Sequence, residues 1–277
     1  IHISVPPDEY AREILPAALA DHPFEGFVED DRGIHCYIKK DDWHGEIDAV
    51  LREAAEQFHL EFIDHISTTE IAHRNWNEEW ERTIRPIHVS DRFIITPSWH
   101  PVEPEPGKTV IVIDPKMTFG TGYHETTRLM MRLMEQFIRP SQRVLDVGTG
   151  TGILAIGAAM LGATNVIGVD IDEWSLENGI ENAERNNVRE AIDIRIGSLE
   201  SVPEREFDVI LANIIRNTIL ELLDTMLAAM APSGTLLLSG LLATDRSTIE
   251  HALQERGCRV LTVLQENDWI AMAAARA

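Results

Sequence analysis

Glycine at three alternating positions near the middle of the chain constrains the fold more than any other feature of the sequence. Residues 143–147, Arg-Val-Leu-Asp-Val, form the apolar run of a buried parallel strand, and the glycine-rich segment 148–152 follows directly. Residues 153–161 then have small and apolar side chains at helical spacing. A strand that ends in a glycine loop and opens a helix places unpaired backbone N–H groups and a positive helix terminus at the carboxyl edge of a sheet. The sequence therefore predicts a ligand site at this edge, with a turn that binds nothing as the alternative.

The spacing of the glycines indicates which ligand the loop suits. Gly148, Gly150 and Gly152 alternate, whereas a dinucleotide fingerprint, G-x-G-x-x-G, requires a glycine where this chain has Ile153. The carboxylate of Asp146 would also repel a pyrophosphate. The pattern D-x-G-x-G-x-G instead resembles the nucleotide loop of class I S-adenosylmethionine-dependent methyltransferases, whose cofactor carries a sulfonium and no phosphate. A nicotinamide-dependent oxidoreductase is therefore disfavoured.

The next predicted strand, residues 165–171, carries an acid at its tip. Asp170 follows the start of the glycine loop by a little over twenty residues, where nucleotide-binding folds position a carboxylate for the ribose hydroxyls. Asp172 is better placed than Asp170 to cap the helix that begins near residue 173. We therefore predict that Asp170 binds ribose.

Composition sets the broad class of the protein. The chain has 277 residues, of which 44% are hydrophobic, enough for one large and one small domain with ordinary cores. No apolar run approaches the ~18–20 residues of a membrane span, and the N-terminus lacks the basic-then-apolar pattern of a leader. The two cysteines, Cys36 and Cys258, match neither a metal spacing nor a redox pair. We expect a soluble cytoplasmic protein with buried thiols and no metal site.

The net charge indicates the kind of partner. Asp and Glu number 46 against 24 Lys and Arg, which gives a formal net charge of -22. The resulting field repels nucleic acid and attracts basic proteins. We therefore expect a basic protein as substrate and no direct binding of nucleic acid. A monomer that does not bind membranes is expected as well.

The pattern of elements divides the chain into three segments. Residues 1–67 follow the order β-α-β-β-α-β, the split-βαβ pattern of ferredoxin-like domains, and contain no catalytic cluster. Residues 68–84 predict a linker helix in which Trp76 and Trp80 lie one turn apart. Residues 85–277 form the third segment. In the first segment, strands are predicted over residues 1–5, 24–29, 34–39 and 60–66, and helices over 8–20 and 46–58.

Beyond the glycine loop the third segment alternates between strands and helices, which predicts a mostly parallel sheet covered on both faces. A closing hairpin added to such a sheet is typical of the seven-stranded class I methyltransferase fold, which the chain resembles. Further strands are predicted over residues 92–96, 109–113, 192–197, 207–212, 235–239, 259–265 and 269–274, and further helices over 128–137, 174–186, 218–230 and 243–256.

A second glycine-containing loop precedes the helix predicted over residues 128–137. Residues 117–127 read Met-Thr-Phe-Gly-Thr-Gly-Tyr-His-Glu-Thr-Thr, with Thr126 and Thr127 as potential helix caps. The residues alone leave two interpretations open, a capped helix with a flexible lead-in or a loop that closes over the ligand. They also leave His124 open as a structural hydrogen-bonding group or a catalyst.

From about Trp76 onward the chain resembles the bacterial methyltransferases of large-subunit ribosomal protein L11. The residues that carry the resemblance are 119–127, 146–152, Asp170 and 213–215. It implies an α/β fold in which a seven-stranded Rossmann-like methyltransferase domain, residues 85–277, follows a small α+β ferredoxin-like domain, residues 1–67, that recognises the substrate. It also implies transfer of methyl groups from S-adenosylmethionine to amino groups of protein L11, with lysine side chains as the acceptors and the N-terminal amine left open.

The resemblance also assigns the site. Asn213 is the expected catalytic residue, because its side-chain oxygen can accept a hydrogen bond from the amine and orient the nitrogen lone pair for in-line transfer. The expected cofactor contacts are Phe119, Gly120, Thr127, Asp146, Gly148, Gly150, Asp170, Ile171 and Asn213.

Two departures from the family pattern bear on the substrate. The family usually has a small residue and a proline near Glu125, and small residues where this chain has Arg216 and Asn217. The second departure lies near the expected substrate entrance, so a lysine of a different protein remains an alternative target. A non-catalytic module that binds S-adenosylmethionine is a further alternative, against which the intact Asn213 and the threonine loop argue.

Overall fold

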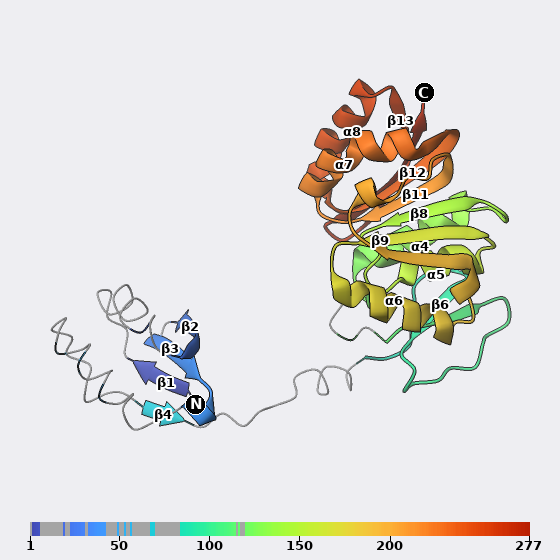
Figure 1. Ribbon diagram of the computed structural model, residues 1–277. Coiled ribbons are helices and arrows are strands. Elements are labelled where there is room, and N and C mark those ends of the chain that lie inside the picture. Colours follow the sequence, from blue (N-terminus) through green and yellow to red (C-terminus); the bar gives the residue numbers. More distant parts are fainter. Residues whose placement is uncertain are drawn as a thin grey trace. The chain divides into compact units, whose positions relative to one another are not determined.

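The chain divides into two compact units, Ile1–Glu79 and Trp80–Ala277, each described here by itself (Figure 1). The division falls inside the predicted linker 68–84. Among the described residues, none of the helices combines the length and hydropathy needed to span a bilayer. The computed structural model describes residues 2–5, 19, 23–30, 33–42, 49, 53, 56, 67–69, 84–114, 116 and 120–277.

The N-terminal unit contains a four-stranded sheet in the order β2-β3-β1-β4. All neighbouring strands are antiparallel, and β3 lies between β1 and β2, as a split βαβ arrangement requires. Asp30 pairs with Gly33 across the predicted hairpin turn. Cys36 is buried in β3. The strands are β1 (His2–Val5), β2 (Phe24–Asp30), β3 (Gly33–Ile38) and β4 (Ser67–Thr69), with a 3-10 turn η1 (Lys40–Asp42).

Other predictions for this unit fall mainly outside the described residues. Ala49, Glu53 and Glu56 are helical and exposed, as a helix over residues 46–58 requires. The helix predicted over residues 8–20 and the strand over 60–66 lie outside the described residues, apart from Leu19. Thr68 and Thr69 are in strand β4, so this strand extends past the predicted boundary at residue 67.

The second unit is built on a seven-stranded sheet in the order β10-β9-β8-β11-β12-β14-β13. The first five strands are parallel, and β14 runs antiparallel between β12 and β13. The chain therefore leaves the central strand β8 toward both edges, which creates a crevice at the carboxyl ends of β8 and its neighbours. The strands are β8 (Arg143–Val147), β9 (Asn165–Asp170), β10 (Ile192–Ile196), β11 (Phe207–Asn213), β12 (Met230–Leu242), β13 (Cys258–Glu266) and β14 (Trp269–Arg276).

Helices cover both faces of this sheet (Figure 1). In β11, Val209 and Leu211 join the core beneath α4, α5 and α6, whereas Ile210 and Ala212 join the core beneath α7 and α8. This alternation follows from the period of two in a strand that is buried on both sides. The helices are α4 (Glu125–Phe137), α5 (Ile153–Met160), α6 (Glu173–Arg185), α7 (Arg216–Ala229) and α8 (Arg246–Glu255), with 3-10 turns η3 (Arg189–Ala191), η4 (Leu199–Ser201) and η5 (Ala243–Asp245). The predicted mostly parallel sheet and closing hairpin are confirmed.

A smaller sheet in the order β5-β6-β7 precedes the seven-stranded one. The Asn186 side chain accepts a hydrogen bond from Val112 N at 2.8 Å and donates one to Val112 O at 2.6 Å, so β7 is tied to the end of α6. The strands predicted near residues 92–96 and 109–113 are confirmed. The strands are β5 (Ile87–His88), β6 (Phe93–Thr96) and β7 (Thr109–Val112).

Helix α4 and strand β12 both begin earlier than the sequence predicts. Thr126 and Thr127 do not cap α4, because the helix begins at Glu125 and both threonines lie buried in its first turn. His124 is the N-cap, since its backbone is extended and its Nδ1 accepts a hydrogen bond from Thr126 N. Strand β12 begins at Met230 rather than residue 235, because Met230 already pairs with Phe207 before a register shift. Asp172 caps α6, as predicted, by accepting from Trp174 N.

Gly240 in β12 has a backbone conformation and a contact that both exclude a side chain. Its φ is +81°, and an added Cβ would lie 2.3 Å from Ile214 O. Gly257 has a similar φ of +69°, but an added Cβ there meets nothing within 4 Å. We predict that Gly240→Ala lowers the free energy of unfolding by at least ~3 kcal/mol, against ~1 kcal/mol for Gly257→Ala, in urea titrations. Equal losses for the two variants would contradict the role of the Ile214 contact.

Candidate functional site

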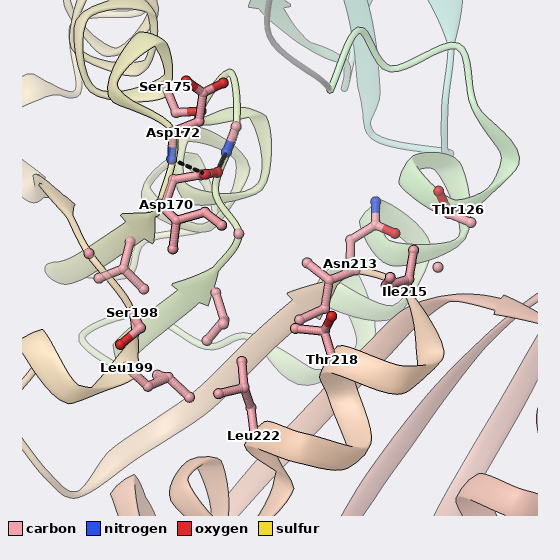
Figure 2. Close-up of a pocket in the computed structure, with 18 of the residues that line it drawn as sticks. Thr126, Asp170, Asp172, Ser175, Ser198, Leu199, Asn213, Ile215, Thr218 and Leu222 are labelled. Carbon is pink, nitrogen blue, oxygen red and sulfur yellow. Dashed lines mark hydrogen bonds between the residues drawn. The ribbon is translucent and has the colours of Figure 1, made fainter.

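A cavity of about 610 Å³ lies at the carboxyl edge of the seven-stranded sheet (Figure 2). It is lined by the tips of β8, β9 and β11, by the residues after β10, by the first turns of α4 and α7, and by Trp269 of β14. Its size is that of a pocket for a cofactor or drug-sized ligand. It is the crevice that the topology places beside the central strand, as predicted.

The glycine loop is joined to β9 by main-chain hydrogen bonds. Gly148 N and Thr149 N both donate to Val169 O, at 2.9 and 3.1 Å, and Gly152 N donates to Thr149 O. Gly150 N donates to Asp170 Oδ2 at 2.8 Å. The expectation of unpaired loop N–H groups is therefore wrong for the three glycines, because the loop folds back on the neighbouring strand. What the glycines offer a ligand is a surface without side chains.

The conformation of the loop requires glycine. Gly148, Gly150 and Gly152 have φ values of +74°, +52° and +79°, a region that side chains disfavour. At Gly148 an added Cβ would also lie 2.5 Å from Ile214 Cγ2. The three alternating glycines are thus explained by backbone geometry, in addition to any contact with a ligand.

Asp170 lies at the cavity wall with both carboxylate oxygens oriented. Oδ2 accepts from Gly150 N, and Oδ1 accepts from Asp172 N at 3.0 Å, as the dashed lines in Figure 2 show. Each carboxylate oxygen can accept more than one hydrogen bond. Asp170 therefore keeps acceptor capacity toward the cavity while its geometry is fixed by two main-chain donors.

Asp146 lies behind the glycine loop and does not line the cavity. It is fully buried, and its Oδ2 accepts from Thr149 Oγ1 at 2.7 Å and Ala155 N at 3.2 Å. Its Oδ1 has no hydrogen-bond partner among the described residues. Burial raises the pKa of the Asp146 carboxyl to about 7, against the opposing effect of these two hydrogen bonds. The contacts show Asp146 holding the loop to the start of α5.

Asn213, the last residue of β11, lines the cavity with an unsatisfied oxygen. Its Oδ1 is buried and has no hydrogen-bond partner among the described residues. Thr127 Oγ1, in the first turn of α4, is a second buried oxygen of this kind. A buried polar group without a partner costs about 1–3 kcal/mol. The Asn213 oxygen, which lines the cavity, therefore fits a ligand that brings a hydrogen-bond donor to this end of the sheet.

The structure brings together a part of the predicted set. Gly148, Gly150, Asp170, Ile171 and Asn213 all line the cavity. Gly120, Thr127 and Asp146 do not line it, and Phe119 lies outside the described residues. Gly120 is nevertheless fixed beside the glycine loop, because its carbonyl oxygen accepts from Thr151 Oγ1 at 2.7 Å.

Sequence reasoning missed several lining residues. Ser198 and Leu199 follow β10, and their position after a third parallel strand was the signal that could have found them. Trp269 reaches the cavity only because β14 inserts into the sheet, where its ring meets the His124 ring edge-on at 4.7 Å between centroids. Nothing local in the sequence marks Trp269 for this place.

The chemistry of the lining limits the ligand. Val147, Val169 and Leu199 provide apolar surface, and Asp170 and Asp172 are carboxylates. Among the described residues that line the cavity, none is a lysine or an arginine. Such a site fits a ligand with a flat apolar group, vicinal hydroxyls and a positive charge, and it does not fit a phosphate. S-adenosylmethionine has these features.

The fold and this cavity define a class I, Rossmann-like methyltransferase domain. A family model for ribosomal protein L11 methyltransferase matches residues 18–277. The chain belongs to this family.

Individual relatives agree with this assignment. The ribosomal protein L11 methyltransferase of Chlorobaculum tepidum is 35% identical over 266 residues, which cover 94% of this chain and 90% of the relative. That of Porphyromonas gingivalis is 38% identical over 268 residues, covering 95% and 90%. A crystal structure of a ribosomal protein L11 methylase from Lactobacillus delbrueckii matches with a TM-score of 0.64 and 33% identity, over 69% of this chain and 98% of that one.

Asp146 gives the stability of the protein a pH dependence. Its pKa of about 7 in the folded state exceeds the ~3.9 of an unfolded aspartate. Between these values the folded state holds a proton that the unfolded state releases, so this group lowers the free energy of unfolding as pH rises from about 4 to 7. We predict that Asp146→Asn, neutral at every pH, exceeds the parent in stability at pH 8 by on the order of 2–4 kcal/mol.

The control for this prediction is the same pair of proteins at pH 4. There the folded parent carries a protonated Asp146 and the unfolded parent is about half protonated, so most of the difference is gone and the two proteins should unfold at similar urea concentrations. A variant that is less stable than the parent by the same amount at both pH values would refute the assignment of the buried proton.

Proposed function

We propose that the protein transfers methyl groups from S-adenosylmethionine to amino groups of ribosomal protein L11, in the cytoplasm. Membership of the family supports the reaction and the substrate. The observation that carries the proposal is the buried Oδ1 of Asn213, to which no described residue donates a hydrogen bond, in a cavity that the Asp170 carboxylate also lines. The Asn213 oxygen suits an amine donor, and the Asp170 carboxylate suits ribose hydroxyls.

Residues on two strand tips would hold the cofactor. Asp170 would accept from the ribose hydroxyls, and the bare surface of Gly148 and Gly150 would lie against the ligand. Ile171, 81% exposed at the cavity rim, would cover an apolar ring. Phe119, Gly120 and Thr127 remain predicted contacts from the second loop, and Asp146 a predicted contact through the glycine loop. S-adenosylmethionine supplies an electrophilic methyl group on a sulfonium.

Asn213 supplies the orientation that the reaction needs. The acceptor must be a neutral amine, whereas a free lysine has a pKa near ~10.4. The site must therefore select the neutral form of the amine, and the Asn213 oxygen accepts a hydrogen bond from that amine and directs its lone pair. Alignment and exclusion of water account for most of the rate in such a transfer. The proton leaves to water before the transfer.

The remaining parts of the chain are assigned to substrate binding. Residues 1–67 are proposed as the substrate-recognition domain and residues 68–84 as a linker helix to the catalytic domain, 85–277. The net charge of -22 favours a basic protein and disfavours direct contact with nucleic acid. The protein is proposed to act as a monomer. A lysine of a different basic protein is the second candidate substrate. The reason is that the family usually has a small residue where this chain has Arg216, which directly follows the cavity-lining Ile215.

Mass spectrometry tests the proposal directly. The protein is incubated with labelled S-adenosylmethionine and either purified L11 or a mixture of the other ribosomal proteins. L11 is expected to gain the mass of one labelled methyl group, less one hydrogen, for each transfer, and peptide mapping would locate the gains on lysines or the N-terminal amine. Label only in the other proteins would favour the second candidate, and no label in any protein would refute the catalytic role.

Asp170→Ala is expected to weaken binding of S-adenosylmethionine by ~1–3 kcal/mol, the scale of a lost hydrogen bond to a charged group. Isothermal calorimetry measures the Kd. Asp172→Ala is the control, because this carboxylate also lines the cavity but caps α6. That variant should lose ~1 kcal/mol of stability and retain most of its cofactor affinity. Unchanged affinity in Asp170→Ala would remove the ribose assignment.

Asn213→Ala is expected to lower kcat at saturating cofactor and substrate by at least ~10-fold, because an interaction that orients the nucleophile is lost. The Kd for S-adenosylmethionine should change less than kcat does. Asn165→Ala is the control, an exposed asparagine at the opposite end of the parallel strands. A normal turnover number in Asn213→Ala would exclude this residue from the mechanism.

A further inference from the structure

Arg216 places a positive charge beside a site that suits positively charged ligands. It is the first residue of α7 and directly follows Ile215, which lines the cavity. A cation in the first turn of a helix opposes the helix dipole, so the position is unfavourable for arginine. Two residues of the lining, Asp170 and Asp172, are acidic. An arginine at this mouth therefore requires an explanation.

Two side chains hold the guanidinium. Arg216 Nη1 donates to Asp245 Oδ1 at 2.8 Å, and Nε and Nη2 donate to Asn217 Oδ1 at 3.2 and 3.1 Å. The Arg216 side chain is 45% exposed, whereas the Asp245 side chain is 11% exposed. The carboxylate is thus the shielded and fixed member of the pair.

Asp245 is itself positioned by the end of β12. Its Oδ2 accepts from Leu242 N at 2.9 Å, so both carboxylate oxygens are engaged. Asp245 closes the 3-10 turn η5 that leads into α8. The anion that meets Arg216 is therefore held by the end of β12 and not by the helix that carries Arg216.

The geometry of α7 shows on which side of the helix Arg216 lies. Thr218 and Leu222 lie one turn apart on α7 and both face the cavity (Figure 2). Arg216 precedes Thr218 by two residues, which turns it about 200° around the helix. The rotation of the helix therefore points the Arg216 side chain to the side of α7 away from the cavity, where its guanidinium pairs with Asp245.

We propose that Asp245 is a positioning residue that pairs with Arg216 and keeps this cation off the mouth of the cavity, so that the site accepts positively charged lysine-rich substrates. The inference rests on the proposed function and adds a determinant of its substrate class. Without the pair, a mobile arginine beside Ile215 would repel both an incoming ammonium and a basic protein surface. Because Asp245 does not line the cavity, it should act on substrate binding rather than on the chemical step.

The test compares KM and kcat for L11 in the parent, Asp245→Asn, Arg216→Met and the double variant. Asp245→Asn removes the neutralising charge, and a unit charge ~10 Å away in a medium of effective dielectric ~40–80 changes binding about two- to fourfold. We expect KM to rise by that factor with kcat unchanged, and the rise to vanish in ~0.5 M KCl. Arg216→Met retains the aliphatic stem, and its KM should equal or fall below that of the parent.

The double variant separates electrostatics from structure. If Asp245 acts through Arg216, the double variant returns KM to the parental value or lower. If Asp245 matters only because it binds Leu242 N, the double variant keeps the raised KM, and the inference is overturned. An unchanged KM in Asp245→Asn overturns it too. Should Asp245→Asn fold poorly by circular dichroism, Arg216→Met decides alone, since a KM above that of the parent contradicts the proposal.

Failure of the proposed function has a different signature. It appears as a parent protein that does not methylate L11. The affinities of the parent and the variants are then ranked by their Kd for a fluorescein-labelled lysine-rich peptide, measured by fluorescence anisotropy at low and high KCl. The same order supports the inference, and no difference among the variants overturns it.

Discussion

The cavity depends on the hydrogen bonds that join the glycine loop to the tip of β9. One carbonyl, Val169 O, accepts from two successive loop amides, and the Asp170 carboxylate accepts from a third. These bonds make the shape of the loop a property of the protein rather than of its ligand. A site that is already formed has less conformational entropy to lose on binding. The same carboxylate that is proposed to hold ribose also holds the loop, so the two tasks cannot be separated at Asp170.

A second constraint acts from the other side of the crevice. Ile214, directly after Asn213, lies so close to Gly148 that a Cβ there would be 2.5 Å from its side chain. Its carbonyl oxygen makes an equally tight approach to Gly240 of β12. Ile214 is therefore packed between two glycines, Gly148 and Gly240, which leave no room for a side chain of their own. This contact fixes the direction in which β11 delivers Asn213, and it couples three strands at one point.

The sequence predicted the features that depend on short stretches of the chain. The alternation of strands and helices predicted the sheet, and the acid at the end of β9 predicted Asp170 as a cavity residue, because both depend on short-range periodicity and spacing. The pairing of the loop amides was predicted wrongly, since the partner strand that accepts them is set by tertiary structure. The His124 cap was missed because an imidazole took the place that a threonine usually fills. Trp269 could not be found at all, as it comes from a strand inserted beside a distant part of the chain.

The insertion of β14 has a consequence for the order in which the sheet can be completed. β12 pairs with β11 on one side and with β14 on the other, although β13 precedes β14 in the chain. Until residues 269–276 are in place, β12 presents an open row of backbone donors and acceptors to its surroundings, and such rows recruit foreign strands. During synthesis the nascent domain is therefore exposed to misassociation until its innermost late strand arrives, and a chaperone that shields strand edges would act on this interval.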